Sequence, residues 1–467
     1  MRYDLVIVGM GSGGIVAAEF AASLGVRVAV VERSRVGGDC LWTGCVPSKA
    51  LLASAKVAHH MRTADGYGLG AVEPEVDLAA VWRRIRAVQE QIATTDDDPA
   101  RYQAMGIELI FGSARLAGPN AVAVGDRVLE TRRVLLCTGS RPAVPPVPGL
   151  EEAGFLTSEN LFELEHPPHS VVVLGGGPIG VEMAQAMNRL GIRVTLLQRG
   201  DRLVPRDEPE LAELLADVLR TEGVDVRLDT SASRVTVEEG RKVVHGADGG
   251  RWEGEEILVA AGRTPTIDGL GLEEAGVELG PRGVAVDGRM RTNVSSIYAV
   301  GDVAGRYLFT HSAGHEAGLA VRDMFFPGKG KVSDQVPWTT FTDPELAHVG
   351  LTVAQAEERH GAKNVAVARV DLSHSDRARA DGATEGRIVL VTARDKLVGA
   401  HILAPAAGEM IHEPALAIRH RMKLRELATM IHVYPTMTTS INLLAAEAAY
   451  GYAQRYRWLV RREKQAA

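Results

Sequence analysis

Two segments of the chain combine a short apolar strand, a glycine-rich turn and a helical stretch, and each continues into a second apolar strand. In the first segment, residues 5–8 form the predicted strand, and Gly9, Gly11 and Gly14 follow at G-x-G-x-x-G spacing. The first glycine permits a tight turn, the second lets the backbone approach a pyrophosphate, and the third lets the helix pack closely on the strand. Glu32 ends the second strand, where a carboxylate accepts hydrogen bonds from a ribose diol. This order of elements predicts a dinucleotide-binding unit.

The second segment carries its glycines at Gly175, Gly177 and Gly180, directly after the apolar run VVVL. Where the first unit has its acid, this unit has a neutral Gln198 followed by Arg199. These side chains suit the 2′-phosphate of NADPH slightly better than the ribose diol of NADH. Two such units predict either two bound dinucleotides, or one dinucleotide and a repeat that has lost its ligand.

Size and composition narrow the class of protein. At 467 residues the chain is too long for one hydrophobic core and predicts roughly three domains. The net charge of −7 comes from interspersed acidic and basic residues, which gives no electrostatic reason to expect nucleic acid as a partner. No apolar run approaches the roughly 18 residues of a membrane-spanning helix, and the N-terminal run is too short for a signal peptide. Because the chain has only three cysteines, we expect no disulfide scaffold and a reducing, cytoplasmic location.

Cys40 and Cys45 stand in GGDCLWTGCVPSK, and the pair is a metal clip, an incidental pair or a redox-active pair. No C-x-x-C motif or histidine pair accompanies it, so no metal site is predicted. In an ideal helix the two Cα atoms would lie roughly 8.6 Å apart, whereas a disulfide needs about 4.4–6.8 Å. A bonded pair therefore requires a departure from the helix, which Gly44 permits. Pro47 suits a first helical position and would place Cys45 near a helix N-terminus, where a thiolate is stabilised.

Taken together, these motifs resemble the FAD-dependent pyridine nucleotide–disulfide oxidoreductases, a family that includes glutathione reductase, dihydrolipoamide dehydrogenase and mercuric reductase. The resemblance covers almost the whole chain, and it assigns FAD to the first dinucleotide unit and NAD(P)H to the second. It implies that Cys40 and Cys45 form a redox-active disulfide, that Lys49 contacts the flavin, and that Glu182 pairs with this lysine. VLLCTGSRP and RTNVSSIYAVGD are similar to further FAD motifs, and FTDPELAHVGLT to the opening of the dimerisation domain. The site residues that the first two of these segments add are Thr138, Gly139 and Asp302 for FAD, and Gly262, in AGRTPTIDG, is assigned to NAD(P).

The chain departs from the family where the disulfide reductases read H-P-T-x-x-E. In IHVYPTMTTSIN, Tyr434 replaces the histidine and Thr439 replaces the glutamate that orients it, and His432 is not treated as a substitute. An imidazole titrates near neutral pH, whereas an unperturbed phenol, near pH 10, is a poor proton shuttle. Glutathione disulfide and lipoamide are therefore disfavoured as acceptors. Mercuric reductases also carry a tyrosine here, but this chain lacks their C-terminal cysteine pair and has Pro178 where they often have another tyrosine.

The predicted fold class is α/β, with two Rossmann-like dinucleotide-binding domains and a C-terminal α+β dimerisation domain. Residues 1–148 and 270–337 are assigned to the FAD domain, 149–269 to the NAD(P) domain and 338–467 to the dimerisation domain. The resemblance implies a homodimeric enzyme that passes two electrons from NAD(P)H through FAD to the Cys40–Cys45 disulfide. The final acceptor would be a small disulfide, an electrophile or a soft metal ion, at a site that Tyr434 of the other subunit lines. Three alternatives stay open: a mercuric reductase, a direct flavin-to-acceptor enzyme (NAD(P)H oxidase, quinone reductase or transhydrogenase), and a non-catalytic FAD-binding redox sensor.

Overall fold

The structure is a computed structural model, and it describes residues 2–328 and 330–459. These residues form two compact units, each assembled from separate stretches of the chain. Unit 1 comprises Met1–Ala53, Asp77–Pro168 and Glu256–Asp334, and unit 2 comprises Ser54–Val76, His169–Glu255 and Gln335–Ala467. Within the described ranges, every helix is too short or too polar to traverse a lipid bilayer. The domain boundaries drawn from the sequence stay a prediction.

A mainly parallel sheet forms the centre of unit 1. Its strands are β1 (Tyr3–Val8), β2 (Val28–Glu32), β3 (Glu108–Phe111), β4 (Ala114–Gly118), β5 (Ala121–Val124), β6 (Arg127–Leu136) and β18 (Ile297–Ala299). β3, β2, β1 and β6 lie in this order and run parallel, β18 also pairs with β6 in parallel, and β4 and β5 add an antiparallel edge. β1 is central, with Val8 opposite Val31 and Leu136. The side chains of β2 are all buried, as expected of a strand inside a covered parallel sheet.

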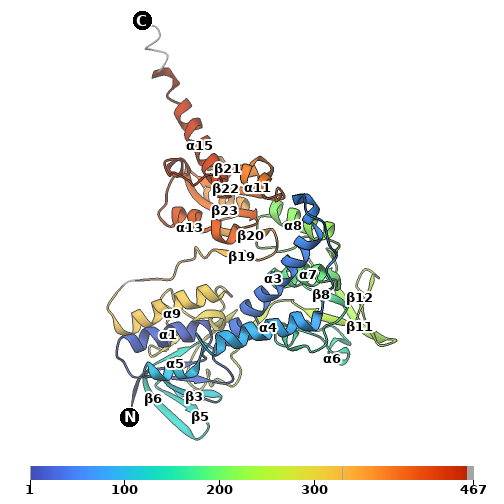
Figure 1. Cartoon of the computed structure of the whole chain (residues 1–467). Helices are drawn as coiled ribbons and strands as arrows, with labels where there is room; N and C mark the ends of the chain where they lie inside the picture. Colours follow the sequence, from blue (N-terminus) through green and yellow to red (C-terminus); the bar gives the residue numbers. More distant parts are fainter. Residues whose placement is uncertain (1, 329, 460–467) are drawn as a thin grey trace. The chain divides into compact units, whose positions relative to one another are not determined.

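Two helices of unit 1 lie side by side, α1 (Ser12–Ser23) and α9 (Thr310–Phe325) (Figure 1). Small residues allow the close approach: a Cβ atom on Gly13 would lie 3.5 Å from the carbonyl oxygen of Ala313, and one on Gly314 would lie 3.4 Å from Val16. The predicted cofactor turn precedes α1, and Thr310 at the start of α9 lies beside Cys45 of the cysteine motif.

Unit 2 contains a second parallel arrangement, formed by β8 (Ser170–Leu174), β9 (Arg193–Leu197) and β10 (Asp225–Arg227). α7 (Pro178–Arg189) connects β8 to β9, and α8 (Pro209–Thr221) precedes β10. The glycine-rich turn between β8 and α7 repeats the turn between β1 and α1. The prediction of two Rossmann-like units is therefore confirmed.

The C-terminal part of unit 2 is an antiparallel sheet with helices. Its strands are β19 (Trp338–Thr340), β20 (Glu345–Gly350), β21 (Val365–Asp371), β22 (Arg387–Ala393) and β23 (Lys396–Ala404), in the order β19-β20-β23-β22-β21. α13 (His412–Arg419) and α15 (Thr439–Gln454) pack against β22 and β23 through a shared apolar core. The short α11 (Asp376–Ala380) follows β21. This α+β arrangement confirms the predicted fold class.

Candidate active site

Close backbone approaches shape the glycine turn of unit 1. Gly9 has a φ of +97°, and a Cβ atom there would lie 2.5 Å from the carbonyl oxygen of Cys137. A Cβ atom on Gly14 would overlap the carbonyl oxygen of Gly9, so only glycine lets α1 pack on β1 in this way. A Cβ atom on Gly11 would meet only the Cα atom of Gly38, at 3.6 Å, among the described residues within 4 Å. The turn leaves a cradle at the N-terminus of α1, where backbone N–H groups bind phosphate, and it fits a dinucleotide.

Glu32 closes this turn at the end of β2. Its Oε2 accepts a hydrogen bond from the backbone N–H of Met10 at 2.7 Å, and its Oε1 accepts one from the N–H of Ser34 at 2.7 Å. A carboxylate has about four acceptor positions, so two of them remain for a ribose diol. The buried carboxylate is held where the predicted role requires it.

A charged network connects Asp302 to the cysteine motif. Ser140 donates a hydrogen bond to the carboxylate of Asp302, and Arg263 donates from Nε to the hydroxyl of Ser140 at 2.6 Å. The guanidinium of Arg263 also bonds to Asp39, the residue before Cys40. Burial raises the pKa of Asp302, while Ser140 and Arg263 act to lower it. Sequence reasoning missed Arg263, because Asp39 lies 224 residues away and no local pattern marks the contact.

Three other predicted cofactor residues also lie in unit 1. The hydroxyl of Thr138 donates to the carbonyl oxygen of Thr266 at 2.7 Å, and Gly139 has a φ of +68°. Gly262, which was assigned to NAD(P), accepts a hydrogen bond from the N–H of Ala143 at 2.9 Å through its carbonyl oxygen. These contacts fix the backbone around the two motifs, and the cofactor roles stay predictions.

The two cysteines lie on different helices, as the sequence geometry requires for a close pair. Cys40 is in α2 (Gly38–Trp42), and Cys45 is the first residue of α3 (Cys45–Arg62). Gly44 sits at the break, where a Cβ atom would lie 2.9 Å from the carbonyl oxygen of Asp39. The predicted departure from one helix and the position of Cys45 at a helix N-terminus are both confirmed. The redox-active disulfide between them stays a prediction.

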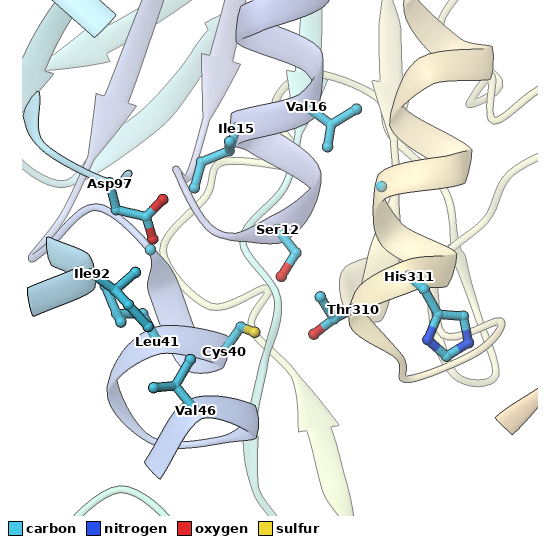
Figure 2. Close-up of a pocket in the computed structure, with 12 residues that line it drawn as sticks. Ser12, Ile15, Val16, Cys40, Leu41, Val46, Ile92, Asp97, Thr310 and His311 are labelled. Atoms are coloured by element: carbon cyan, nitrogen blue, oxygen red, sulfur yellow. The ribbon is translucent and has the colours of Figure 1, made fainter. Parts of the chain in front are cut away.

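Neighbouring groups shift the pKa of the Cys40 thiol in opposite directions. A hydrogen bond with Cys45 and burial raise its pKa, and the hydroxyl groups of Thr310 and Ser12 lower it. Figure 2 shows Ser12 and Thr310 projecting toward Cys40 from the starts of α1 and α9. The ring of His311 lies on the far side of Thr310 from Cys40 (Figure 2).

A cavity of about 420 Å³ opens beside Cys40. Asp97 is its acidic group, and burial raises the pKa of this carboxyl. Among the described residues that line it, there is neither lysine nor arginine. Most of its wall is aliphatic, from Ile15, Val16, Leu41, Val46 and Ile92.

The glycine turn of unit 2 uses the same closing bond with a different side chain. Oε1 of Gln198 accepts a hydrogen bond from the N–H of Gly176 at 2.9 Å, just as Glu32 accepts from Met10 in unit 1. Arg199 is exposed beside it. The remaining predicted residues of this turn are Gly175 with a φ of +116°, Gly177 at the N-cap of α7, and buried Gly180.

Lys49 and Glu182, the predicted pair beside the flavin, lie on α3 in unit 1 and on α7 in unit 2. Glu182 is buried, and its Oε1 accepts a hydrogen bond from the N–H of Phe341 at 2.9 Å. The pairing of the two residues stays a prediction.

Comparison with known proteins agrees with this architecture. Residues 3–317 match the family model "Pyridine nucleotide-disulphide oxidoreductase", and residues 336–445 match the dimerisation domain of that family. The chain belongs to the pyridine nucleotide–disulphide oxidoreductase family. Dihydrolipoyl dehydrogenase of Thermus scotoductus is 37% identical, covering 97% of this chain and 98% of that protein. Mercuric reductase of Bacillus cereus is 34% identical over 94% of this chain and 70% of its own length.

A solved structure is also similar along nearly the whole chain. The Cu(II) complex of the HOCl-induced flavoprotein disulfide reductase RclA from Escherichia coli superposes with a TM-score of 0.86 and 28% identity. The superposition covers 96% of this chain and 99% of the RclA chain. Members of the oxidoreductase family bind FAD and use NAD(P)H, so this protein is a FAD-dependent NAD(P)H disulfide oxidoreductase. The prediction that this protein is an enzyme, and not a non-catalytic sensor, is thereby confirmed.

Tyr434, the residue at which this oxidoreductase departs from its family, forms a side-chain hydrogen bond. The hydroxyl of Tyr434 donates to Oδ2 of Asp376 at 2.8 Å, and this bond raises the pKa of Tyr434. The hydroxyl of Thr439 bonds to the backbone close to Tyr434: it accepts a hydrogen bond from the N–H of Thr436 at 3.3 Å. His432 is buried, with Nε2 3.1 Å from Oε1 of Glu413. Asp376 was not predicted, because it stands 58 residues before Tyr434 and in no recognised motif.

Proposed function

We propose that this oxidoreductase reduces a thiophilic metal ion at the Cys40–Cys45 pair, with NAD(P)H as the electron source. The observation that carries the proposal is Tyr434, which stands where disulfide reductases of the family carry their acid–base histidine and whose hydroxyl donates to Asp376. The cavity beside Cys40 adjoins the dinucleotide cradle at the N-terminus of α1, since Ser12 lines it, and we assign it to FAD.

The thiol pair suits such a substrate. Soft cations prefer thiolate ligands, and the hydrogen bond between Cys40 and Cys45 places two sulfurs together. Among residues 2–328 and 330–459, no group of three or more His, Cys, Asp or Glu side chains is arranged to hold a metal. The metal ion is therefore proposed as a substrate that is bound by two sulfurs and released, and not as a resident cofactor.

The relatives include metal-reducing enzymes, and they do not favour a metal acceptor over a disulfide. Mercuric reductases from several bacteria are similar over most of the chain, and the RclA structure is a Cu(II) complex. The dihydrolipoyl dehydrogenases are equally similar in sequence. Tyr434 replaces the imidazole that disulfide reductases of the family use, which favours the metal-reducing relatives over the disulfide-reducing ones.

Each predicted residue has a place in this proposal. Bound FAD would supply two-electron redox chemistry between NAD(P)H and the cysteine pair. Glu32 and the glycine turn would hold the dinucleotide, and Lys49 and Glu182 would tune the flavin. Cys45, at the N-terminus of α3, would face the cofactor, and Cys40 would bind the metal ion. Two electrons reduce one Hg(II) to Hg(0), or two Cu(II) to two Cu(I).

The assembly and the location are part of the same proposal. The dimerisation domain at residues 336–445 supports a homodimer in which Tyr434 of one subunit completes the acceptor site of the other. The absence of a nucleic-acid partner and a cytoplasmic location are inferred from the charge and the cysteine content, and a small-molecule acceptor from the family.

The test is anaerobic NAD(P)H consumption by the FAD-loaded protein, with the thiol complex of Hg(II) as acceptor and glutathione disulfide, cystine and lipoamide in parallel. We expect turnover with Hg(II), and we expect Cys40→Ser to lose it while keeping FAD bound. Cys137→Ser is the matched control, because this third cysteine lies outside the cavity lining and its variant should keep full activity. If the protein turns over one of the disulfides but neither Hg(II) nor Cu(II), the proposed acceptor class is overturned.

A further inference from the structure

The phenol of Tyr434 has only one proton to donate, and this proton is engaged. The hydroxyl donates to Oδ2 of Asp376 at 2.8 Å. An ionised carboxylate accepts hydrogen bonds and has none to give, so the phenol must be the donor in this pair. What the phenol presents to any other group is therefore its oxygen lone pairs.

Asp376 is itself held in place. It is the first residue of α11, and the side chain of Ser375 caps this helix by accepting from the N–H of Ala378. Its other oxygen, Oδ1, lies 3.8 Å from Nη1 of Arg379 on the same helix. The carboxylate thus directs one oxygen toward Arg379 and the other toward Tyr434.

Fold stability does not account for this bond. The side chain of Tyr434 is 67% exposed, and the neighbouring Ile431 and Val433 are 99% and 76% exposed. A solvent-exposed hydrogen bond contributes about 1 kcal/mol or less to folding. The exposed apolar segment around Tyr434 also belongs to the dimerisation domain, where a second copy of the chain is expected.

We propose that Asp376 is a positioning residue that selects the acceptor by committing the hydroxyl proton of Tyr434 and leaving its oxygen to face the substrate. Reduction of a disulfide releases a thiolate that must take up a proton, and a phenol bonded to Asp376 is poorly placed to supply it. A metal cation takes up no proton, and the negative end of the phenol dipole, at the oxygen, attracts it electrostatically. The inference rests on the proposed function, since it takes Tyr434 to line the acceptor site.

Asp376→Asn is the informative variant, because the amide keeps nearly the same shape while the negative charge is removed. Asp376→Glu retains the carboxylate and should restore the bond in part. Asp381→Asn is the matched control: Asp381 is an exposed carboxylate directly after α11, and it pairs with Arg377 instead, at 2.6 Å. All three variants are compared with the wild type as FAD-loaded protein.

The first readout needs no acceptor. Ultraviolet difference titration, with Tyr434→Phe subtracted, isolates the ionisation of this phenol. We expect its pKa to fall toward the ordinary value near 10 in Asp376→Asn and to stay raised in Asp381→Asn. An unchanged titration in Asp376→Asn would overturn the positioning role, whatever the acceptor proves to be.

The second readout is kcat/KM for the thiol complex of Hg(II) and for cystine. We expect Asp376→Asn to lose about tenfold toward Hg(II), with no loss or a gain toward cystine, and Asp376→Glu to recover most of the loss. Equal effects of Asp376→Asn and Asp381→Asn would overturn the inference. If the wild type does not turn over Hg(II) or Cu(II), the proposed function has failed instead, and the titration separately decides the role of Asp376.

Discussion

The sulfur atom of Cys45 lies 3.3 Å from the hydroxyl oxygen of Thr310, and these two residues begin α3 and α9. Two helix N-termini therefore meet at the cysteine pair, and each directs partial positive charge toward it. The hydroxyl of Thr310 also lowers the pKa of Cys40, against the effect of Cys45 and burial. Nucleophilicity at this site depends on that balance, because the thiolate is the reactive form.

Thr310→Val removes the hydroxyl and keeps the shape of the side chain. Since this hydroxyl lowers the pKa of Cys40, we expect the variant to hold less thiolate and to react about 3- to 10-fold more slowly with iodoacetamide at pH 8. The measurement is alkylation of Cys40 in the reduced protein, followed by peptide mass mapping. Thr94→Val, which loses an exposed helix-end hydroxyl in another part of unit 1, should react like the wild type. An unaltered Cys40 rate in Thr310→Val would contradict this assignment.

Glu32→Gln should weaken FAD binding. The side chain accepts two backbone hydrogen bonds at 2.7 Å, and an amide nitrogen at either position would face an N–H donor. Loss of one charge-assisted bond, about 1.5–3 kcal/mol, corresponds to roughly 10- to 100-fold in the dissociation constant. Recovery of flavin fluorescence on dilution measures the release of FAD. Gln198→Ala removes the equivalent bond from the other turn, so it should raise KM for NAD(P)H and leave FAD retention unaltered.

Arg199→Ala tests the preference for NADPH. If the exposed guanidinium binds the 2′-phosphate, its loss should lower the NADPH-to-NADH ratio of kcat/KM about tenfold or more, because arginine–phosphate bonds are charge-assisted. Steady-state kinetics with both coenzymes measure the ratio. Arg193→Ala at the start of β9 is the matched control, since it removes an exposed arginine from the opposite end of the same strand. Equal ratios in the wild type and Arg199→Ala would show that another group selects the coenzyme.

Asp207 predicts a pH dependence of stability. It is buried, accepts a hydrogen bond from Nε1 of Trp338 at 2.9 Å, and burial raises its pKa from 3.8 to about 7. The folded state therefore binds one more proton than the unfolded state between these pH values. The stability that this group contributes is complete below about pH 4 and is lost as the pH rises to about 7.

Asp207→Asn removes this titration and keeps an oxygen for Trp338. On going from pH 4 to pH 8, the free energy of unfolding should shift in favour of the variant by up to about 4 kcal/mol. Denaturant titrations of both proteins at the two pH values measure the difference. The nearby His401, whose pKa burial lowers to about 4, titrates in both proteins and largely cancels. A difference that does not vary with pH would show that Asp207 is ionised in the fold.

The parts of the fold and site that could be predicted have local causes. Gly9, Gly11 and Gly14 specify a turn through contacts with residues near in sequence or on the adjoining strand, so their spacing is sufficient to recognise it. The separation of Cys40 and Cys45 onto two helices also has a local cause, because Gly44 breaks the helix between them. The position of Glu32 at the end of β2 also has a local cause, and its role toward the ribose stays a prediction.

The sequence by itself thus determined the two dinucleotide turns, the position of Cys45 at a helix N-terminus, and the replacement of a histidine by Tyr434. Only the tertiary structure decided which groups act on these residues. Thr310 reaches Cys45 from 265 residues away, Arg263 reaches Asp39 from 224, and Asp376 reaches Tyr434 from 58. Such contacts depend on how sheets and helices pack, and a threonine, arginine or aspartate leaves no periodic or spacing pattern that shows where its side chain ends. The sequence therefore identifies the reactive residues, and the packing of distant segments sets the hydrogen bonds and charges that act on them.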